Sequence, residues 1–271
     1  MNRLFRNISI SGLMLVLVSV VSLGLVGCGR NDDGNDNPLG LINRGVLTIA
    51  TDADFAPFEN IDAQGNPYGI SIAIIREVAT MLGLTLDIRL MDWNATLMST
   101  QVGQADMAVA GITIREDRRA VMDFTIPWFQ AGQVVVTHAG NTALDNMSAE
   151  QIRAHLNGQT VGGVVGQSGA LSAESWGANV QGFEMNAPML LAVANQTGGL
   201  RYAVMDNVAA KAAARDNPNL RVVNTVLTSE QYGFAVRQGN AELLYQVNNA
   251  MATMLLSGRI DAIFAHYAPW L

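Results

Sequence analysis

The chain has 271 residues, of which 23 are acidic and 16 basic, so its formal net charge is −7, and 49% of the residues are hydrophobic. The negative charge argues against a nucleic-acid partner, which would require a basic surface. A single cysteine excludes an intrachain disulfide. The sequence shows no metal-ligand spacing and no Ser, His and Asp set, and we interpret His138, His155 and His266 as isolated structural or surface residues. We therefore expect no cofactor and no metal.

The first 28 residues have the layout of a secretory leader. Arg3 and Arg6 precede an apolar run over residues 8–26, and "LVGC" ends at Cys28. The run is also long enough for an uncleaved transmembrane anchor. The cysteine after small residues resembles the lipobox of bacterial lipoproteins, in which Cys28 is lipidated and becomes the new N-terminus. Both interpretations place the remainder outside the cytoplasm on a tether.

Cleavage before Cys28 would remove two basic residues and no acid, which leaves 14 basic against 23 acidic residues and a formal charge of −9. The polar, glycine-rich "GRNDDGNDNPLG" that follows predicts a flexible linker over residues 29–43. About 230 residues then remain, enough for two units of roughly 100 to 130 residues each.

Strand-like and helix-like stretches alternate along the rest of the chain. The first group predicts a strand at 46–51, a helix at 70–82, a strand at 84–90, a helix at 95–102 and a strand at 106–111. The pattern restarts with a strand at 159–165, a helix at 169–176, a strand at 181–185, a helix at 187–195, a strand at 201–205 and a helix at 207–215. This order predicts two α/β units, each with a mostly parallel sheet.

The C-terminal piece is too small to form a third unit. It contains strand-like stretches at 220–227 and 232–236 and helical patterns at 241–258 and 260–270. We expect it to return to the first unit, which makes two crossovers near residues 129–133 and 229–233. The predicted lobes are therefore residues 44–130 plus 232–271 for lobe 1, and residues 131–231 for lobe 2.

Polar residues follow several of the predicted strands. In an open α/β sheet, ligands bind beyond the carboxyl ends of the strands, near helix N-termini. The residues at these positions are Asp52, Asp54, Gly111, Thr113, Ser168 and Asp206.

The charged stretch "AGITIREDRR", residues 110–119, allows two interpretations. Thr113 and Glu116 have the spacing of a capping box that starts a helix. Arg118, one turn later, is either a solvated helix residue or a two-pronged donor to a carboxylate.

Four stretches in order carry a family resemblance: "ATDADFAPFEN", "GNPYGISIAIIREVATMLGL", "LMDWNATLMSTQVGQADMAVAGITIREDRRAVMDFTIPW" and "EQYGFAVRQGNAELLYQVNNAM". They resemble the amino-acid-binding proteins of polar amino-acid ABC transporters, family 3 of the bacterial extracellular solute-binding proteins, from about residue 44 to 271. The resemblance implies a two-lobed periplasmic-binding-protein fold of type II, with two crossover strands.

The resemblance also assigns roles in the first lobe. It implies that Arg118 clamps the α-carboxylate of an amino acid with the help of Thr113, and that the Gly111 carbonyl serves the ammonium. The aromatic pair that sandwiches the ligand falls on Phe55 and Trp93.

In the second lobe, the loop that offers N–H groups to the carboxylate falls on Gly166, Gln167 and Ser168, and the acid that pairs with the ligand ammonium falls on Asp206. The chain departs from the family pattern at Ser71 and Ala73, where two acids are usual, although Ser71 could still cap the helix. Arg201 also occupies a position at which the family usually has an acidic residue.

The resemblance implies a monomeric, lipid-anchored, extracytoplasmic protein that closes its lobes on a polar amino acid and delivers it to a membrane permease. Asp52, with Asp54 near it, would face the far end of the ligand and reject aspartate and glutamate. Because Val164 and Met205 add apolar surface, we expect glutamine or arginine before lysine or histidine. Two alternatives are a periplasmic cyclohexadienyl or arogenate dehydratase on the same fold and the sensor lobe of a membrane kinase. Since we find no catalytic set, we expect a protein that is not an enzyme.

Overall fold

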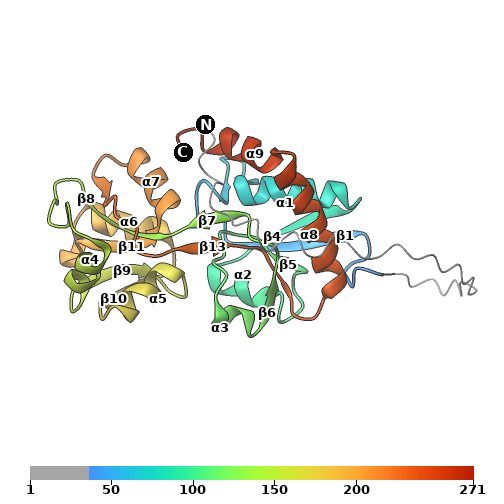
Figure 1. Cartoon of the computed structure of the whole chain (residues 1–271), viewed down its shortest axis with the longest axis horizontal. Helices are drawn as coiled ribbons and strands as arrows, with labels where there is room; N and C mark the ends of the chain where they lie inside the picture. The colour runs from blue at the N-terminus through green and yellow to red at the C-terminus, as the bar shows by residue number, and fades with distance from the viewer. Residues whose placement is uncertain (1–36) are drawn as a thin grey trace, which may run out of the picture. The chain divides into compact units, whose positions relative to one another are not determined.

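Two five-stranded sheets organise the part of the chain that the computed structural model describes, residues 37–271 (Figure 1). The expected leader and Cys28 lie outside the described residues. Each sheet has helices on both faces, which is the α/β architecture that the alternating pattern predicted. No helix between Asn37 and Leu271 has the length and apolar character that crossing a bilayer requires.

The first sheet has the strand order β4-β1-β5-β14-β6. Its strands are β1 (Val46–Thr51), β4 (Thr85–Leu90), β5 (Met107–Ala108), β6 (Met122–Phe124) and β14 (Ala235–Arg237). Strands β4 and β5 lie parallel to β1, and β14 enters antiparallel between β5 and β6. The C-terminal piece therefore returns to the first sheet, as its small size predicted.

Helices cover the two faces of the first sheet unequally. Three of them pack together on one side, namely α1 (Ile70–Met81), α8 (Ala241–Leu256) and α9 (Arg259–Tyr267), whereas α2 (Trp93–Ser99) and the short α3 (Glu116–Arg119) lie on the other (Figure 1). In β1, Leu47 and Ile49 point to the three-helix side, because alternate residues of a strand face opposite ways.

The second sheet has the strand order β10-β9-β11-β8-β12. Its strands are β8 (Gln133–His138), β9 (Thr160–Val164), β10 (Asn179–Phe183), β11 (Tyr202–Asp206) and β12 (Leu220–Val222). Strands β10 and β11 lie parallel to β9, while β8 is antiparallel to β11 and β12. Its helices are α4 (Ala149–Leu156), α5 (Ser168–Ser175), α6 (Asn186–Ala194) and α7 (Asn207–Asp216), with a short 3₁₀ helix, η2 (Thr197–Gly199).

The valines of β8 show how this sheet is buried on both faces. Val134 and Val136 belong to the core under α6 and α7, and Val135 belongs to a separate cluster under α4 and α5. A strand that is buried on both faces has a continuous apolar sequence, as the three valines of β8 do.

Two short strands connect the sheets. Strands β7 (Phe129–Ala131) and β13 (Glu230–Tyr232) pair antiparallel and run between the two lobes, which we define by the two sheets and their helices (Figure 1). Phe129 and Tyr232 belong to an aromatic cluster with Phe58, Trp128 and Phe264. The connection is therefore a packed ladder rather than two separate loops. A small hairpin of β2 (Asn60–Ile61) and β3 (Pro67–Tyr68) precedes α1.

Part of the segment expected to be a linker packs on the first lobe. Leu41 is buried, and the Ile42 N–H donates to Asp106 at 2.8 Å. Asp106, also buried, accepts a second bond from the Thr48 N–H at 2.9 Å. Residues just before 44 therefore pack on the first lobe through the buried Leu41 side chain and the Ile42 backbone bond to Asp106.

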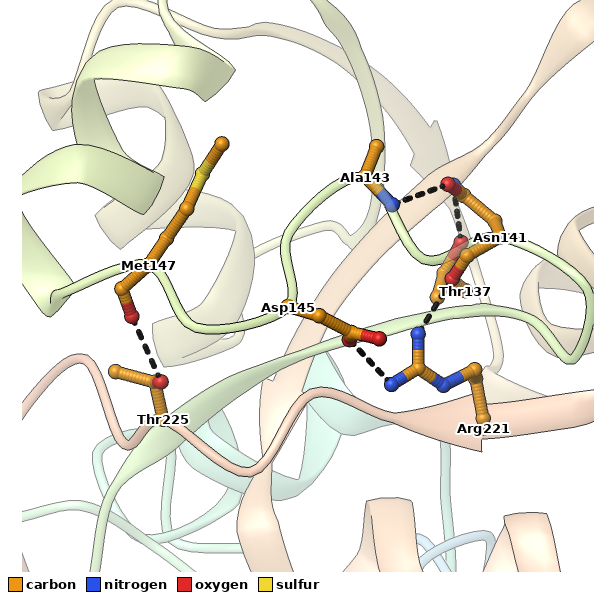
Figure 2. Close-up of polar contacts among 7 residues, drawn as sticks. All are labelled: Thr137, Asn141, Ala143, Asp145, Met147, Arg221 and Thr225. Atoms are coloured by element: carbon orange, nitrogen blue, oxygen red, sulfur yellow. Dashed lines mark hydrogen bonds and ion pairs between the residues drawn. The ribbon is translucent and has the colours of Figure 1, made fainter.

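Side-chain hydrogen bonds hold the loop that follows β8 in the second lobe (Figure 2). Arg221 of β12 donates to the Asn141 carbonyl and pairs with Asp145. Further along, the Thr225 hydroxyl donates to the Met147 carbonyl at 3.1 Å. The loop is thereby tied at both ends to the chain segment that contains β12.

Candidate functional site

A small cavity with room for about one water molecule lies between the two lobes. Eight of the eleven residues predicted as ligand-binding line it: Phe55, Trp93, Gly111, Thr113, Arg118, Gln167, Ser168 and Asp206. Phe55 follows β1, and Gly111 and Thr113 follow β5. Trp93 is the first residue of α2, and Arg118 lies in α3. In the second lobe, Gln167 and Ser168 stand at the start of α5, and Asp206 is the last residue of β11. Strand ends and helix starts from both sheets therefore meet at one place, as expected for an open α/β sheet.

Arg118 is the buried cation of the cavity, with 5% of its surface exposed. Its Nη1 donates to the Thr113 carbonyl at 2.9 Å and its Nη2 to the Gly166 carbonyl at 3.1 Å, and its guanidinium carbon lies 5.3 Å from the Trp93 ring centre. Burial, followed by repulsion from Arg115, lowers its pKa to about 10. Within residues 37–271 no carboxylate forms a salt bridge with it. The side chain is thus fixed in direction and retains N–H groups for an anion.

Asp206 is the buried acid of the cavity. Tyr232 donates its hydroxyl to Asp206. Burial, and then repulsion from Glu230, raise the Asp206 pKa to about 7, although Tyr232, Gln133 and Arg118 oppose the shift. A cation placed beside Asp206 would favour its ionised form.

The predicted capping box at Thr113 and Glu116 is wrong. Helix α3 has Arg115 as its N-cap and no side-chain cap. The Thr113 hydroxyl instead donates to Glu230 at 2.8 Å, across 117 residues of sequence. Glu230 also accepts from Thr228 at 2.6 Å and from Gln133 at 3.1 Å. Thr113 is therefore tied to the connecting strand β13.

Asp52 and Asp54 are not among the cavity-lining residues. The Asp52 Oδ1 atom is shielded from solvent and has no hydrogen-bond partner among residues 37–271. Burial above all, with a smaller repulsion from Asp54, raises the Asp52 pKa to about 7. Asp54 instead joins the lobes: its carboxylate accepts from the Asn186 N–H at 2.7 Å, and its carbonyl accepts from the Asn186 side chain at 3.1 Å.

The start of α5 forms the second-lobe wall. Gly166 has φ +79°, and a Cβ there would lie 2.6 Å from Oδ1 of Asn94, on α2 of the first lobe. Glycine therefore permits the close approach of the lobes. Gln167 is the N-cap of α5, and the buried Ser168 hydroxyl has no hydrogen-bond partner among residues 37–271. These helix-start groups suit an anion.

Sequence reasoning missed Glu59, a fully buried acid of the first lobe. It accepts from the Gly111 N–H at 2.9 Å and from the Ser71 hydroxyl at 2.7 Å. The expectation that Ser71 caps α1 is therefore wrong: the N-cap is Gly69, and no side chain caps the helix. The available signal was an acid in an apolar stretch, "FAPFEN".

The three histidines lie outside the cavity lining. His138 accepts from the Gly140 N–H at 3.1 Å, and His155 shares a 3.2 Å hydrogen bond with Tyr202. His266 is exposed and packs edge-on against Tyr267. Between residues 37 and 271 no group of three or more His, Cys, Asp or Glu residues is placed to hold a metal ion.

Known proteins resemble this chain over most of its length. A probable histidine-binding protein of Neisseria gonorrhoeae is 29% identical over 254 residues, covering 91% of each chain. A solved ancestral arginine-binding protein bound to arginine has 32% identity and a TM-score of 0.75, covering 83% of this chain and 99% of its own. An ancestral amino-acid-binding protein described as a precursor of cyclohexadienyl dehydratase has 29% identity and a TM-score of 0.74, covering 83% of this chain and 96% of its own. Residues 47–269 match the sequence pattern of the bacterial extracellular solute-binding proteins, family 3, and the chain belongs to that family.

Proposed function

We propose that this chain is the substrate-binding component of an ABC transporter and that it captures a polar amino acid between its lobes. The observation that carries the proposal is the pair of opposite charges, Arg118 from the first lobe and Asp206 from the second, on one buried cavity. A free amino acid is a zwitterion at neutral pH, and its burial requires a partner for each charge. Arg118 and Asp206 supply these partners.

The roles follow from the contacts of each residue. Arg118, the Thr113 backbone N–H and the Ser168 helix start serve the α-carboxylate, because each offers a donor on the cavity wall, whereas the Thr113 hydroxyl already donates to Glu230. Asp206 and the Gly111 carbonyl serve the α-ammonium. The rings of Phe55 and Trp93 exclude water from the pair, which strengthens both charge interactions.

Lobe closure is the proposed response to the ligand. The lobes comprise residues 44–130 plus 232–271 and residues 131–231, and the ladder of β7 and β13 is the hinge. Since the ligand would contact both lobes, it favours the closed arrangement over the open one. Two contacts join the lobes, and we therefore interpret this arrangement as the closed one. Arg118 donates to the Gly166 carbonyl, and Asp54 accepts from the Asn186 N–H.

The proposed ligand has a side chain that donates hydrogen bonds, with glutamine or arginine preferred over lysine or histidine. Support comes from the acids near the cavity: Asp52 and Asp206 both lie close enough to Glu59 to raise its pKa, and Glu230 raises that of Asp206. This negative potential disfavours aspartate and glutamate. Val164 and Met205, which were expected to add apolar surface to the pocket, instead belong to the hydrophobic core and do not line the cavity.

Export and anchoring are part of the same proposal. Cys28 would carry the lipid that tethers a monomeric protein to the outer face of a membrane, near its permease. Metabolic labelling with a radioactive fatty acid would test this, since Cys28→Ser should abolish incorporation. Incorporation that persists in the variant would contradict the anchor.

A dehydratase is the second candidate, because one structural neighbour is described as a precursor of such an enzyme. We propose that the chain is not an enzyme. Incubation with prephenate or arogenate and analysis of the products separates the two functions. Turnover that exceeds the spontaneous rate would favour the dehydratase.

A thermal-shift screen of the purified full chain in detergent, against the twenty amino acids, tests the proposed function. An amino acid at about a hundred times its dissociation constant should add roughly 2.7 kcal/mol to stability, which raises Tm by several degrees. Glutamine or arginine should give the largest shift. No shift with any amino acid would contradict the proposal.

A further inference from the structure

Glu59 connects three segments behind the cavity wall. Its own backbone closes a short loop after β1, where the Phe55 N–H donates to the Glu59 carbonyl at 2.9 Å. One carboxyl oxygen accepts from the Gly111 N–H, and the other bonds to Ser71 in the first turn of α1. The loop that carries Phe55, the helix α1 and the segment after β5 therefore share one side chain.

The Gly111 backbone is fixed from two directions. Glu59 holds the N–H of Gly111, and the next peptide is held because the Ile112 N–H donates to the Ala110 carbonyl at 2.8 Å. Since a trans peptide places its C=O opposite its N–H, the Gly111 carbonyl points away from the Ala110 carbonyl. The rings leave room only for glycine at this position, because a Cβ at Gly111 would lie 2.8 Å from the Phe55 ring and 3.0 Å from that of Tyr232.

The surroundings of Glu59 favour a neutral carboxyl group. Its side chain is fully buried, and burial together with repulsion from Asp52 and Asp206 raises its pKa well above the ordinary value. No salt bridge within residues 37–271 involves Glu59. A neutral carboxyl needs no cation, and its carbonyl oxygen can accept from Gly111 while its hydroxyl group bonds with Ser71. An amide could make the same two contacts.

Resting on the proposed function, we propose that Glu59 is a positioning residue that fixes the Gly111 peptide so that its carbonyl accepts the α-ammonium of the bound amino acid. Glu59 acts through Gly111 and does not itself line the cavity. Two requirements follow: the side chain must have the reach of Glu, and it need not carry charge.

The test ranks two substitutions. Glu59→Gln keeps the reach and an acceptor oxygen, whereas Glu59→Asp keeps the acid but is one methylene too short to reach Gly111. Calorimetry with L-glutamine, L-arginine and L-histidine should find Glu59→Gln within threefold of the wild-type affinity. Glu59→Asp should bind at least tenfold more weakly, by a similar factor for every amino acid that binds, because the lost contact is with the ammonium that they share.

Asp106 offers a matched control. It is also a buried acid of the first lobe that accepts two hydrogen bonds, here from Ile42 and Thr48, but it lies outside the cavity lining. Asp106→Asn should lower Tm and leave the affinities within threefold of wild type. Rescue of affinity by Gln but not by Asp at position 59 is a result that a purely structural role would not give.

The outcomes separate this inference from the proposed function. If wild type binds and Glu59→Asp binds equally well, or if Glu59→Gln loses as much affinity as Glu59→Asp, the positioning role is wrong. If wild type binds none of the twenty amino acids, the proposed function fails, and the role of Glu59 with it. Should Glu59→Asp not fold, hydrogen exchange of the wild-type Gly111 amide decides. Slow exchange supports the hydrogen bond, and exchange as fast as in an open glycine loop overturns the role.

Discussion

The first lobe contributes five residues to the cavity from four separate segments, and the second contributes three, all at the boundary between a strand or turn and a helix. Contacts within its own lobe help to fix the first-lobe wall, since Arg118 donates to the Thr113 carbonyl and Glu59 holds Gly111. Two further bonds leave the lobe, from Arg118 to the Gly166 carbonyl and from Thr113 to Glu230 of β13. In the second lobe the Ser168 hydroxyl has no partner among residues 37–271, and Asp206 accepts a bond from Tyr232 of the connecting strand.

This difference indicates a division of labour. Under the proposed function, the first lobe would present a set surface of rings and one cation, on which an amino acid docks before closure. The second lobe supplies helix-start groups and an acid, whose final bonds depend on the connecting strands. Because one wall is already fixed, fewer side chains lose conformational freedom when a ligand binds.

Removal of the first-lobe cation should have the largest effect. Arg118→Ala should abolish measurable amino-acid binding, because a buried carboxylate without its partner costs about 3 to 5 kcal/mol. Arg118→Lys should also bind poorly, since the planar fork is lost. Arg119→Ala, an exposed neighbour on α3, is the control and should bind normally. Calorimetry that finds Arg118→Ala within threefold of wild type would contradict the carboxylate role.

Removal of the second-lobe charge should weaken binding less and without regard to the ligand side chain. Asp206→Asn keeps the shape and loses the charge that faces the ammonium, at a cost of about 1.5 to 3 kcal/mol for a charged hydrogen bond. The exposed Asp216→Asn, at the far end of α7, is the matched control. A loss confined to arginine, lysine and histidine would place Asp206 at the side-chain end of the ligand instead.

Asp52 should matter only to cationic ligands. Asp52→Asn should reduce arginine or lysine affinity by about tenfold, or about 1.4 kcal/mol, and glutamine affinity by much less, because its charge acts without a direct contact. Competition binding with arginine and glutamine measures the ratio. Equal losses for both amino acids would show that Asp52 acts through the fold rather than through its charge.

The pH dependence of the free energy of unfolding should reveal the raised pKa values of Asp52 and Asp206. In the folded protein, burial above all raises the pKa values of Asp52 and Asp206 to about 7, against an ordinary aspartate value of 3.8. Between these pH values the folded state keeps protons that the unfolded state has released, so stability falls as pH rises from about 4 to 7. The slope is at most about 1.4 kcal/mol per pH unit for each acid.

Melting curves of the ligand-free protein between pH 5 and 8 measure this slope. Asp52→Asn and Asp206→Asn should each flatten the curve and raise Tm at pH 8 relative to wild type. Unchanged slopes in both variants would show that these acids are not protonated near neutral pH.

The sequence predicted the order of the elements and the place where the strand ends converge. Helix α1, expected at 70–82, spans Ile70–Met81, and the strand expected at 201–205 spans Tyr202–Asp206. These elements have strong apolar periodicity, which depends on neighbours in sequence. The strand expected at 106–111 pairs only over Met107–Ala108, because Gly111 leaves the ladder to reach Glu59.

The local capping expectations failed for a related reason. Thr113 and Ser71 both stand near a helix start, yet each hydroxyl bonds to a buried acid elsewhere in the chain, Glu230 and Glu59 respectively. Burial makes an unpartnered acid more costly than an uncapped helix end that water can solvate. Contacts between distant residues therefore decide what these hydroxyl groups do, and spacing along the sequence does not reveal them.

The edge of the second-lobe sheet at β12 is short and is hydrogen-bonded to a loop. Strand β12 is an edge of its sheet, and an open edge offers unpaired N–H and C=O groups to another chain. Here the edge strand has only three residues, and Arg221 and Thr225 fasten the 139–147 loop to the same segment (Figure 2). A neighbouring molecule thus meets a short strand beside side chains and a loop, rather than a long free row of backbone donors and acceptors.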